Sequence, residues 1–299
     1  MDEAAVSSPT PKAQIWRKVL YEDQNVPDNY VDPSFLGQLR KNVNPVQFTV
    51  PQALYAATGV TQQICRAVLF VVLFALLKEG SLAPISLLAC IALLCCPAYL
   101  LYVVVEQRHL GKMVADLRRA AIFVAFGFSL APILKTLTET ISTDTVYAMA
   151  AGMLLLHLVT HDYSEDSKYS TPVDGCASLD RCSGSNAWST VSLNGALFAA
   201  VCLASRLPGI VPVFALSTLA VALFVLAPLL CSWIQGRWHR VQVVLTLGHL
   251  GVALAGCGHP ALLVVLACVG LLLPCHFVHC HRLRQNIHGP WDEAIIEDR

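Results

Sequence analysis

The chain has 299 residues, of which 56% are apolar and 13% carry a formal charge, and its mean hydropathy is +0.59. Soluble domains hold about a quarter charged residues, and nucleic-acid-binding domains carry a basic surplus. Here twenty Lys and Arg balance twenty Asp and Glu. The composition therefore excludes the soluble enzyme classes, gives no sign of nucleic-acid binding and indicates a membrane protein.

Long uncharged runs predict the membrane spans. A helix needs about 20 residues to cross a hydrocarbon core of about 30 Å, and in lipid its backbone groups must be hydrogen-bonded within the segment. We therefore expect an all-α fold, a polytopic transmembrane helix bundle of about eight spans. The expected spans cover residues 60–77, 82–105, 120–134, 145–160, 188–205, 207–234, 241–257 and 260–279. The last two divide one uncharged run, because Gly256, Gly258 and Pro260 should interrupt a helix.

The distribution of basic residues predicts the orientation. If both termini are cytosolic, sixteen Lys and Arg lie in cytosolic segments, and only Lys78, Lys135 and Arg206 lie on the opposite side. This bias follows the positive-inside rule. Arg66 lies inside the first expected span, from which its side chain can extend to the cytosolic headgroups.

Three regions follow from these spans. Residues 1–59 form a cytosolic N-terminal region, residues 60–281 a transmembrane domain with a polar loop at 161–186, and residues 282–299 a cytosolic tail. Within the first region Asp32 and Pro33 resemble a helix N-cap and first position. The apolar residues Phe35, Leu36, Leu39 and Val43 then recur on one side of a short amphipathic helix. We expect this side to lie at the membrane surface or, equally, to meet a partner protein.

The histidines give no firm metal site. His276, His279, Cys280 and His281 cluster near the end of the last span, but there is no second ligand pair at a recognisable spacing. We expect these side chains to face lipid headgroups and predict no metal and no cofactor. His157 and His249 lie at membrane depth, where ionisable groups are costly. A neutral imidazole hydrogen-bonded within the bundle is the expectation for both.

The polar stretch from Lys135 to Asp144 has two interpretations. It is an ordinary loop with helix caps, or it is a lipid-headgroup or helix-packing site, in which Lys135 and Glu139 share a helical face. Patterns for a nucleotide-sugar site, such as Asp-x-Asp or G-x-G-x-x-G, do not occur. The residues alone thus indicate a polytopic membrane protein without an identifiable active site.

Four stretches resemble one known family. They are residues 16–42 (WRKVLYEDQNVPDNYVDPSFLGQLRKN), 130–149 (LAPILKTLTETISTDTVYAM), 202–208 (CLASRLP) and 286–294 (NIHGPWDEA). In this order they resemble the family of the C subunits of phosphatidylinositol N-acetylglucosaminyltransferase (PIG-C). The loop at about 164–186 departs from the family pattern, so no role is assigned to it.

The resemblance implies a multi-pass subunit of the endoplasmic-reticulum complex that begins glycosylphosphatidylinositol (GPI) anchor synthesis. That complex transfers GlcNAc from UDP-GlcNAc to phosphatidylinositol. Catalysis in the family belongs to a different chain, the A subunit, so this chain is expected to be a scaffold that also helps to present the lipid. The implied partners are the catalytic A subunit, the H, P, Q and Y subunits, and phosphatidylinositol in the membrane.

Two groups of candidate site residues follow. The first, a candidate lipid-facing or packing motif, comprises Lys135, Thr136, Glu139, Ser142, Thr143, Asp144 and Arg206. The second, a candidate subunit interface, comprises Trp16, Tyr21, Asn29, Tyr30, Phe35, Leu36, His288, Pro290 and Trp291.

Two other functions remain open. A lipid scramblase or transporter of the endoplasmic-reticulum membrane would need a polar path across the bilayer. A membrane-embedded enzyme would need convergent groups, which only His157, His249, Lys135 and Glu139 could supply.

Overall fold

The computed structural model describes residues 40–41, 48–137, 140–163, 181–235, 237–285 and 287–288. The chain divides into two compact units, one of residues Phe48–His279 and one made of both ends, Met1–Gln47 and Cys280–Arg299. Six helical segments are long and apolar enough to cross a membrane, and two further apolar helices are shorter. The protein is therefore a helical membrane protein.

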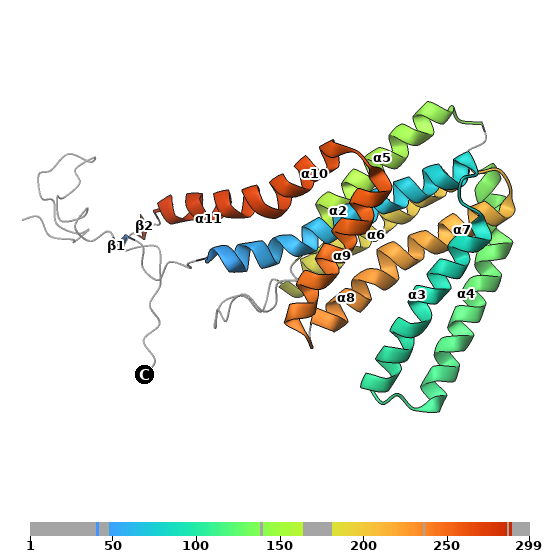
Figure 1. Cartoon of the computed structure of the whole chain (residues 1–299), viewed down its shortest axis with the longest axis horizontal. Helices are drawn as coiled ribbons and strands as arrows, with labels where there is room; N and C mark the ends of the chain where they lie inside the picture. Colours follow the sequence, from blue (N-terminus) through green and yellow to red (C-terminus); the bar gives the residue numbers. More distant parts are fainter. Residues whose placement is uncertain are drawn as a thin grey trace, which may run out of the picture. The chain divides into compact units, whose positions relative to one another are not determined.

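The helices of the described residues are shown in Figure 1. They are α2 (Val50–Glu79), α3 (Pro84–Val105), α4 (Leu110–Thr136), α5 (Thr143–Thr160), α6 (Arg181–Ala204), α7 (Ile210–Val221), α8 (Ala227–Gln235), α9 (His239–Cys257), α10 (Pro260–Ala267) and α11 (Leu273–Leu283). Short π-helical segments η2 (Ala222–Leu226) and η3 (Cys268–Leu272) join α7 to α8 and α10 to α11. Each expected span coincides over most of its length with one of these helical segments.

Three helix starts differ most from the expectation. Helix α2 begins at Val50 rather than near 60, and α4 begins at Leu110 rather than near 120. Helix α6 begins at Arg181, inside the expected loop. The apolar run marks only the lipid-embedded part of a helix, whereas capping sets where the helix starts. At α2 the Gln52 side chain accepts a hydrogen bond from the Thr49 backbone N–H at 3.0 Å.

Glycine ends two of the helices as expected. Gly80 has a φ of 76° after α2, and Gly258 has a φ of 60° after α9. Both values lie in the left-handed region that glycine adopts without steric cost. Pro260 then starts α10, so the predicted division of residues 241–281 is confirmed.

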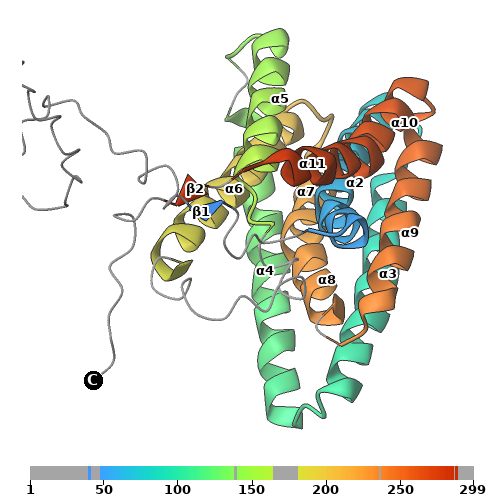
Figure 2. The same cartoon turned by 90° about the vertical axis from the view of Figure 1, so that its left-hand side faces the viewer.

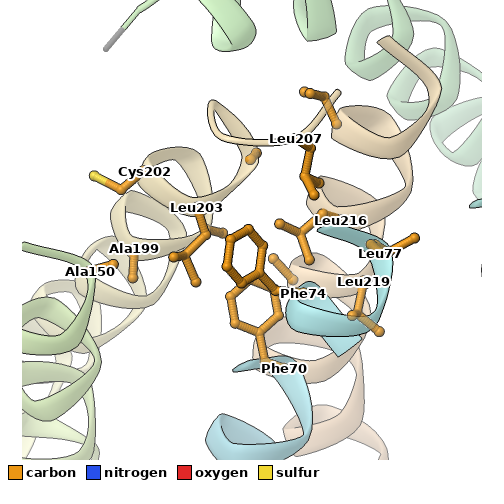
Figure 3. Packing of buried hydrophobic residues seen from close by; sticks show 14 of the residues in the cluster. Phe70, Phe74, Leu77, Ala150, Ala199, Cys202, Leu203, Leu207, Leu216 and Leu219 are labelled. Atoms are coloured by element: carbon orange, nitrogen blue, oxygen red, sulfur yellow. The ribbon is translucent and has the colours of Figure 1, made fainter. Parts of the chain in front are cut away.

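The hydrophobic core lies where α2, α5, α6 and α7 meet. Figure 3 shows Phe70 and Phe74 of α2 between Leu203 of α6 and Leu216 of α7, all four buried. Small residues allow α5 and α6 to approach closely. A Cβ atom added at Gly195 would lie 3.1 Å from the Met153 carbonyl oxygen, so a larger residue there would require α5 to shift.

Helices α3 and α4 have most of their surface exposed. Both pack on α7, and in Figure 2 they are joined at the lower end by the turn between them. Among their residues only Leu87 and Ala131 are buried, and every residue from 117 to 126 is exposed. Exposed apolar side chains on these helices suit contact with lipid, which is as apolar as leucine.

The second unit contains a two-stranded antiparallel ladder. Strand β1 (Arg40–Lys41) pairs with strand β2 (Ile287–His288), with Arg40 opposite His288 and Lys41 opposite Ile287. The amphipathic helix expected through Val43 is therefore wrong at Arg40–Lys41, where long-range strand pairing replaces the local helical preference. Its earlier part lies outside the described residues, as do residues 164–180 of the divergent loop.

Candidate functional site

The stretch from Lys135 to Asp144 connects α4 to α5. Lys135 and Thr136 form the last turn of α4 and are exposed, while Thr143 and Asp144 are exposed in the first turn of α5. Ser142 is the N-cap of α5, because its Oγ accepts a hydrogen bond from the Thr145 backbone N–H at 3.3 Å. The interpretation as a connection with helix caps therefore accounts for these residues; Glu139 lies outside the described part.

Arg206 links this connection to the one between α6 and α7. Its guanidinium Nη2 donates a hydrogen bond to the Ile141 carbonyl oxygen at 2.7 Å. Ile141 belongs to the second stretch that resembles the family, and Arg206 belongs to the third. Two stretches that are distant in sequence are thus in direct contact.

Lys78 joins the end of α2 to Tyr147 of α5, close to the α4–α5 connection. Its Nζ donates to the Tyr147 hydroxyl at 2.6 Å and lies 5.0 Å from the centroid of the Tyr147 ring. The Tyr147 ring in turn packs against Phe74, with 6.1 Å between centroids. We call the residues that join these connections, Lys78, Ile141, Tyr147 and Arg206, the Arg206 end of the bundle.

A second polar cluster joins the α3–α4 turn to the end of α8. The Glu106 carboxylate accepts hydrogen bonds from Trp233 Nε1 at 2.8 Å and Arg237 Nη2 at 2.7 Å. The Trp233 hydrogen bond and the Arg237 charge hold the pKa of Glu106 below its usual range. The Trp233 ring also makes an edge contact with Tyr102 at 5.4 Å. We call Glu106, Trp233 and Arg237 the Glu106 cluster.

Asp116 ties α3 to α4 close to the Glu106 cluster. Its carboxylate accepts a hydrogen bond from the Tyr99 hydroxyl at 3.1 Å and pairs with Arg119 at 2.8 Å. Arg108 in the turn pairs with the same carboxylate. These contacts join the two exposed helices at the end where neither has a buried residue.

A buried polar layer on α2 is the part that the sequence reasoning missed. Gln62 and Gln63 are fully buried, and Arg66 is only 2% exposed. Arg66 donates to Gln62 Oε1 at 3.2 Å, and Gln62 Nε2 donates to Thr246 Oγ1 of α9 at 2.8 Å. The expected reach of Arg66 to the cytosolic headgroups is wrong, because α2 starts at Val50 and so places this residue near the middle of the helix.

His157 completes the polar layer from α5. Its Nδ1 lies 2.9 Å from the Ser192 carbonyl oxygen of α6, and its Nε2 is hydrogen-bonded to the Gln63 amide nitrogen. A carbonyl only accepts and an amide nitrogen only donates, so the imidazole is neutral with its proton on Nδ1. The expectation of a satisfied packing histidine is confirmed. The signal that could have revealed the layer is the polar spacing of residues 62, 63 and 66 on one helical face.

The polar layer occupies a limited length of α2. Beyond Arg66 the helix buries Phe70, Phe74 and Leu77 instead. His249, the second histidine at membrane depth, contacts the Leu245 carbonyl oxygen of its own helix at 2.8 Å. In the described ranges no group of three or more His, Cys, Asp and Glu side chains could hold a metal ion.

The candidate residues of the subunit interface are only partly visible. His288 lies in β2, opposite Arg40. The others, Trp16, Tyr21, Asn29, Tyr30, Phe35, Leu36, Pro290 and Trp291, lie outside the described residues. The ladder nevertheless brings together the backbones of two of the resembling stretches, 16–42 and 286–294.

Comparison with known proteins identifies the family. Residues 16–292 match the family model described as phosphatidylinositol N-acetylglucosaminyltransferase (GPI2). The chain is 37% identical over 296 residues to the C subunit of phosphatidylinositol N-acetylglucosaminyltransferase from Homo sapiens, covering 95% of this chain and 93% of that protein.

Two further relatives agree with this match. The C subunit from Mus musculus is 37% identical over 302 residues, which cover 97% of this chain and 95% of that protein. The GPI2 subunit of the same transferase from Schizosaccharomyces pombe is 27% identical over 94% of this chain and 86% of its own length. No solved structure matches the chain. The chain therefore belongs to the PIG-C family, the C subunits of phosphatidylinositol N-acetylglucosaminyltransferase, and its role is in GPI biosynthesis.

Proposed function

We propose that this chain is a non-catalytic membrane subunit of the GPI-GlcNAc transferase complex of the endoplasmic reticulum. The complex transfers GlcNAc from UDP-GlcNAc to phosphatidylinositol, and this chain serves it as a scaffold. Family membership supports the pathway, and the human relative is named as one lettered subunit, which implies a multi-subunit enzyme. The A, H, P, Q and Y subunits are the proposed partners.

The observation that carries the scaffold role is the set of hydrogen bonds that the family-like stretches make within this chain. Arg206 donates to the Ile141 carbonyl, Lys78 donates to Tyr147, and Ser142 caps α5. Each of these contacts is made within this chain. None of them brings together a pair of carboxylates, which a catalytic site for sugar transfer would use. Such residues shape the bundle surface that other subunits and lipids meet.

Contacts between connections support the proposed topology. Glu106 and Arg237 pair although they lie in different connections, both expected on the cytosolic side. Arg206 and Ile141, expected on the opposite side, also meet. The β1–β2 ladder requires Arg40–Lys41 and Ile287–His288 to share one side of the membrane. An even number of spans, with both ends cytosolic, is consistent with all three contacts.

The exposed residues of the first candidate group are proposed to meet lipid headgroups. Lys135, Thr136, Thr143 and Asp144 are exposed at the ends of α4 and α5, where a span enters the headgroup layer. Ser142 and Arg206 serve packing instead, through the contacts given above. The aromatic residues of the two chain ends are proposed to bind partner subunits.

The transporter alternative has weaker support. A scramblase needs a continuous polar path through the bundle. On α2 the buried polar side chains stop at Arg66, and Phe70, Phe74 and Leu77 fill the core beyond it. This arrangement suits a packing layer better than a path.

The test is reconstitution of GlcNAc transfer. We expect no transfer by the purified chain alone, and loss of transfer when this chain is omitted from an otherwise complete complex. Adding the chain back should restore activity, and an unrelated polytopic protein of similar size is the control. GlcNAc transfer by the isolated chain would overturn the scaffold role, and full activity without it would overturn membership of the complex.

A further inference from the structure

Three basic side chains share one surface at the turn that joins α3 to α4. Arg108 of the turn and Arg119 of α4 both pair with the Asp116 carboxylate, Arg119 at 2.8 Å. Lys112 precedes Asp116 by four residues and therefore lies one turn away on the same face of α4. The side chains of Arg108 and Arg119 are 27% and 77% exposed, and Lys112 is also exposed. One carboxylate thus holds two guanidinium groups on the face that carries Lys112.

This surface keeps a positive charge after its ion pairs are counted. Residues 106–119 contain four Lys and Arg but only two Asp and Glu, and one of these acids, Glu106, pairs with Arg237. Asp116 is the remaining acid of the segment, and it faces three bases. A guanidinium group has five N–H donors. Within the described ranges the guanidinium groups of Arg108 and Arg119 have no hydrogen-bond acceptor other than Asp116, so both keep donors for a second anion.

An exposed apolar strip continues from the bases along α4. Phe123 and Phe126 follow Arg119 by four and seven residues, a spacing that keeps all three on one helical face. The two phenylalanines are 39% and 63% exposed, and they lie in the apolar run of the helix, which begins just after Arg119. A phospholipid whose phosphate meets the bases can therefore lay an acyl chain along the same face. A water-soluble anion would gain nothing from this strip.

We propose that Arg108, Lys112 and Arg119 bind the phosphate group of an anionic phospholipid, and that Asp116 is a positioning residue for the two guanidinium groups. Arginine binds phosphate oxygens through its fork of N–H donors and lysine as a point charge. The site rests on the proposed function, because it requires the α3–α4 turn to lie on the cytosolic face. It gives the scaffold a defined place at which to hold the lipid that the complex glycosylates.

Lipid binding can be measured on the full-length chain in mild detergent by native mass spectrometry. The probes are phosphatidylinositol and phosphatidylserine, with phosphatidylcholine as the neutral reference, and the wild type should prefer both anionic lipids. Lys112→Gln/Arg119→Gln should weaken their binding by about 25-fold, at roughly fivefold per basic residue. The matched control Arg282→Gln/Arg284→Gln removes the same charge from two other exposed positions and should leave the binding nearly unchanged.

Asp116→Asn distinguishes a positioned site from diffuse attraction by the sign of its effect. The variant raises the net charge by one, so diffuse attraction would bind anionic lipids more tightly, by roughly fivefold. In the proposed site the variant should weaken binding severalfold, because two guanidinium groups lose the carboxylate that orients them. Tyr99→Phe is the matched control. It removes the 3.1 Å hydrogen bond to the same carboxylate without changing a charge, and it should keep the wild-type binding.

Several outcomes would overturn the site. Equal losses in the two double variants, or tighter binding by Asp116→Asn, would show diffuse charge attraction. Equal binding of anionic and neutral lipids by the wild type would remove the basis of the proposal. Full displacement of the lipids by millimolar inorganic phosphate would show a site for a free anion instead.

Two further measurements test the fold of the variants and their binding to protein. Elution volume and thermal unfolding of Lys112→Gln/Arg119→Gln in detergent should match the wild type, since both side chains are exposed and surface ion pairs contribute little to stability. If this variant keeps lipid binding but no longer captures another subunit, the surface binds protein and the proposal is overturned. Because no GlcNAc transfer is measured, failure here leaves the test of the scaffold role untouched.

Discussion

Arg206 and Ile141 are joined by a hydrogen bond of 2.7 Å between the guanidinium Nη2 and the backbone carbonyl oxygen. The bond connects the α6–α7 turn to the α4–α5 connection, and Lys78 adds the end of α2 through Tyr147. Three connections of the bundle are thus fixed to one another at the Arg206 end. Tyr147 belongs to α5, the same helix that supplies His157 to the polar layer.

Replacing Arg206 should loosen the Arg206 end. An exposed hydrogen bond from a charged donor contributes about 1 kcal/mol, so Arg206→Gln should lower the free energy of unfolding by about that amount. Thermal unfolding in mild detergent measures the loss. Lys135→Gln, at an exposed position of the neighbouring connection, is the control and should change little. Equal effects of the two variants would show that the Arg206–Ile141 bond is not the cause.

The pair of Gln63 and His157 should show energetic coupling. Gln63→Leu leaves the buried His157 Nε2 without its donor, which should cost about 1–3 kcal/mol. In Gln63→Leu/His157→Leu both partners are apolar, so the loss should be smaller than the sum of the two single losses by at least about 0.5 kcal/mol. As a control, His249 bonds its own helix, so His249→Leu should add to Gln63→Leu independently. If the losses from Gln63→Leu and His157→Leu were strictly additive in the double variant, the Gln63–His157 hydrogen bond would be ruled out.

Gly195 should not tolerate alanine. The added Cβ would lie 3.1 Å from the Met153 carbonyl oxygen, and separating α5 from α6 should cost about 1–3 kcal/mol of stability. Gly152 is the matched control, since a Cβ there has nothing within 4 Å. Gly152→Ala should be neutral or slightly stabilising in a helix. If the unfolding curves of Gly195→Ala and Gly152→Ala coincided, close packing of α5 on α6 would be contradicted.

The Glu106 cluster should make the free energy of unfolding depend on pH. The pKa of Glu106 in the folded chain lies below its ordinary value of 4.5, chiefly because Trp233 donates to the carboxylate, with Arg237 adding to the effect. A carboxyl group with a lowered folded pKa stabilises the fold above its unfolded pKa, and this contribution is lost as the pH falls through the folded value. Melting temperatures between pH 7 and pH 3 should therefore fall less steeply for Glu106→Gln than for the wild type. Glu79→Gln, at an exposed helix end, should keep the wild-type slope, and identical slopes for all three would refute the effect.

Trp291 should contribute to the assembly of the complex. A tryptophan followed in sequence by Asp292 and Glu293 suits a protein pocket better than an anionic lipid surface. Trp291→Ala should weaken capture of the other subunits by about 2 kcal/mol or more and leave membrane insertion unchanged. Co-purification in mild detergent provides the measurement. Undiminished recovery of every other subunit would show that Trp291 is a lipid anchor instead.

The sequence predicted the helical spans well, because an uncharged run of about 20 residues has few alternatives to a helix in lipid. It predicted the break at Gly258 and Pro260 for the same local reason. Helix ends were less accurate, since α2 and α4 continue beyond their apolar runs. The late start expected for α2 also led to the wrong depth for Arg66.

Contacts between residues that are distant in the chain could not be predicted from the periodicity of the sequence. Gln63 meets His157 across 94 positions of the chain, and Gln62 meets Thr246 across 184. The Arg40–His288 pairing involves only two residues per strand, too few for a periodic signal. Contacts of this kind depend on how whole helices pack rather than on spacing along one helix.

The polar layer has a consequence for how the chain is made. Helix α2 precedes the other spans of the described residues, and Thr246, the partner of Gln62, follows 184 residues later. At about 5–20 residues per second, the ribosome needs about 10–40 s to cover that distance. Until then Gln62 lacks its hydrogen-bond partner on α9, and Gln63 lacks His157 until α5 has been made. We therefore expect α2 to remain beside the insertion machinery until α9 has emerged.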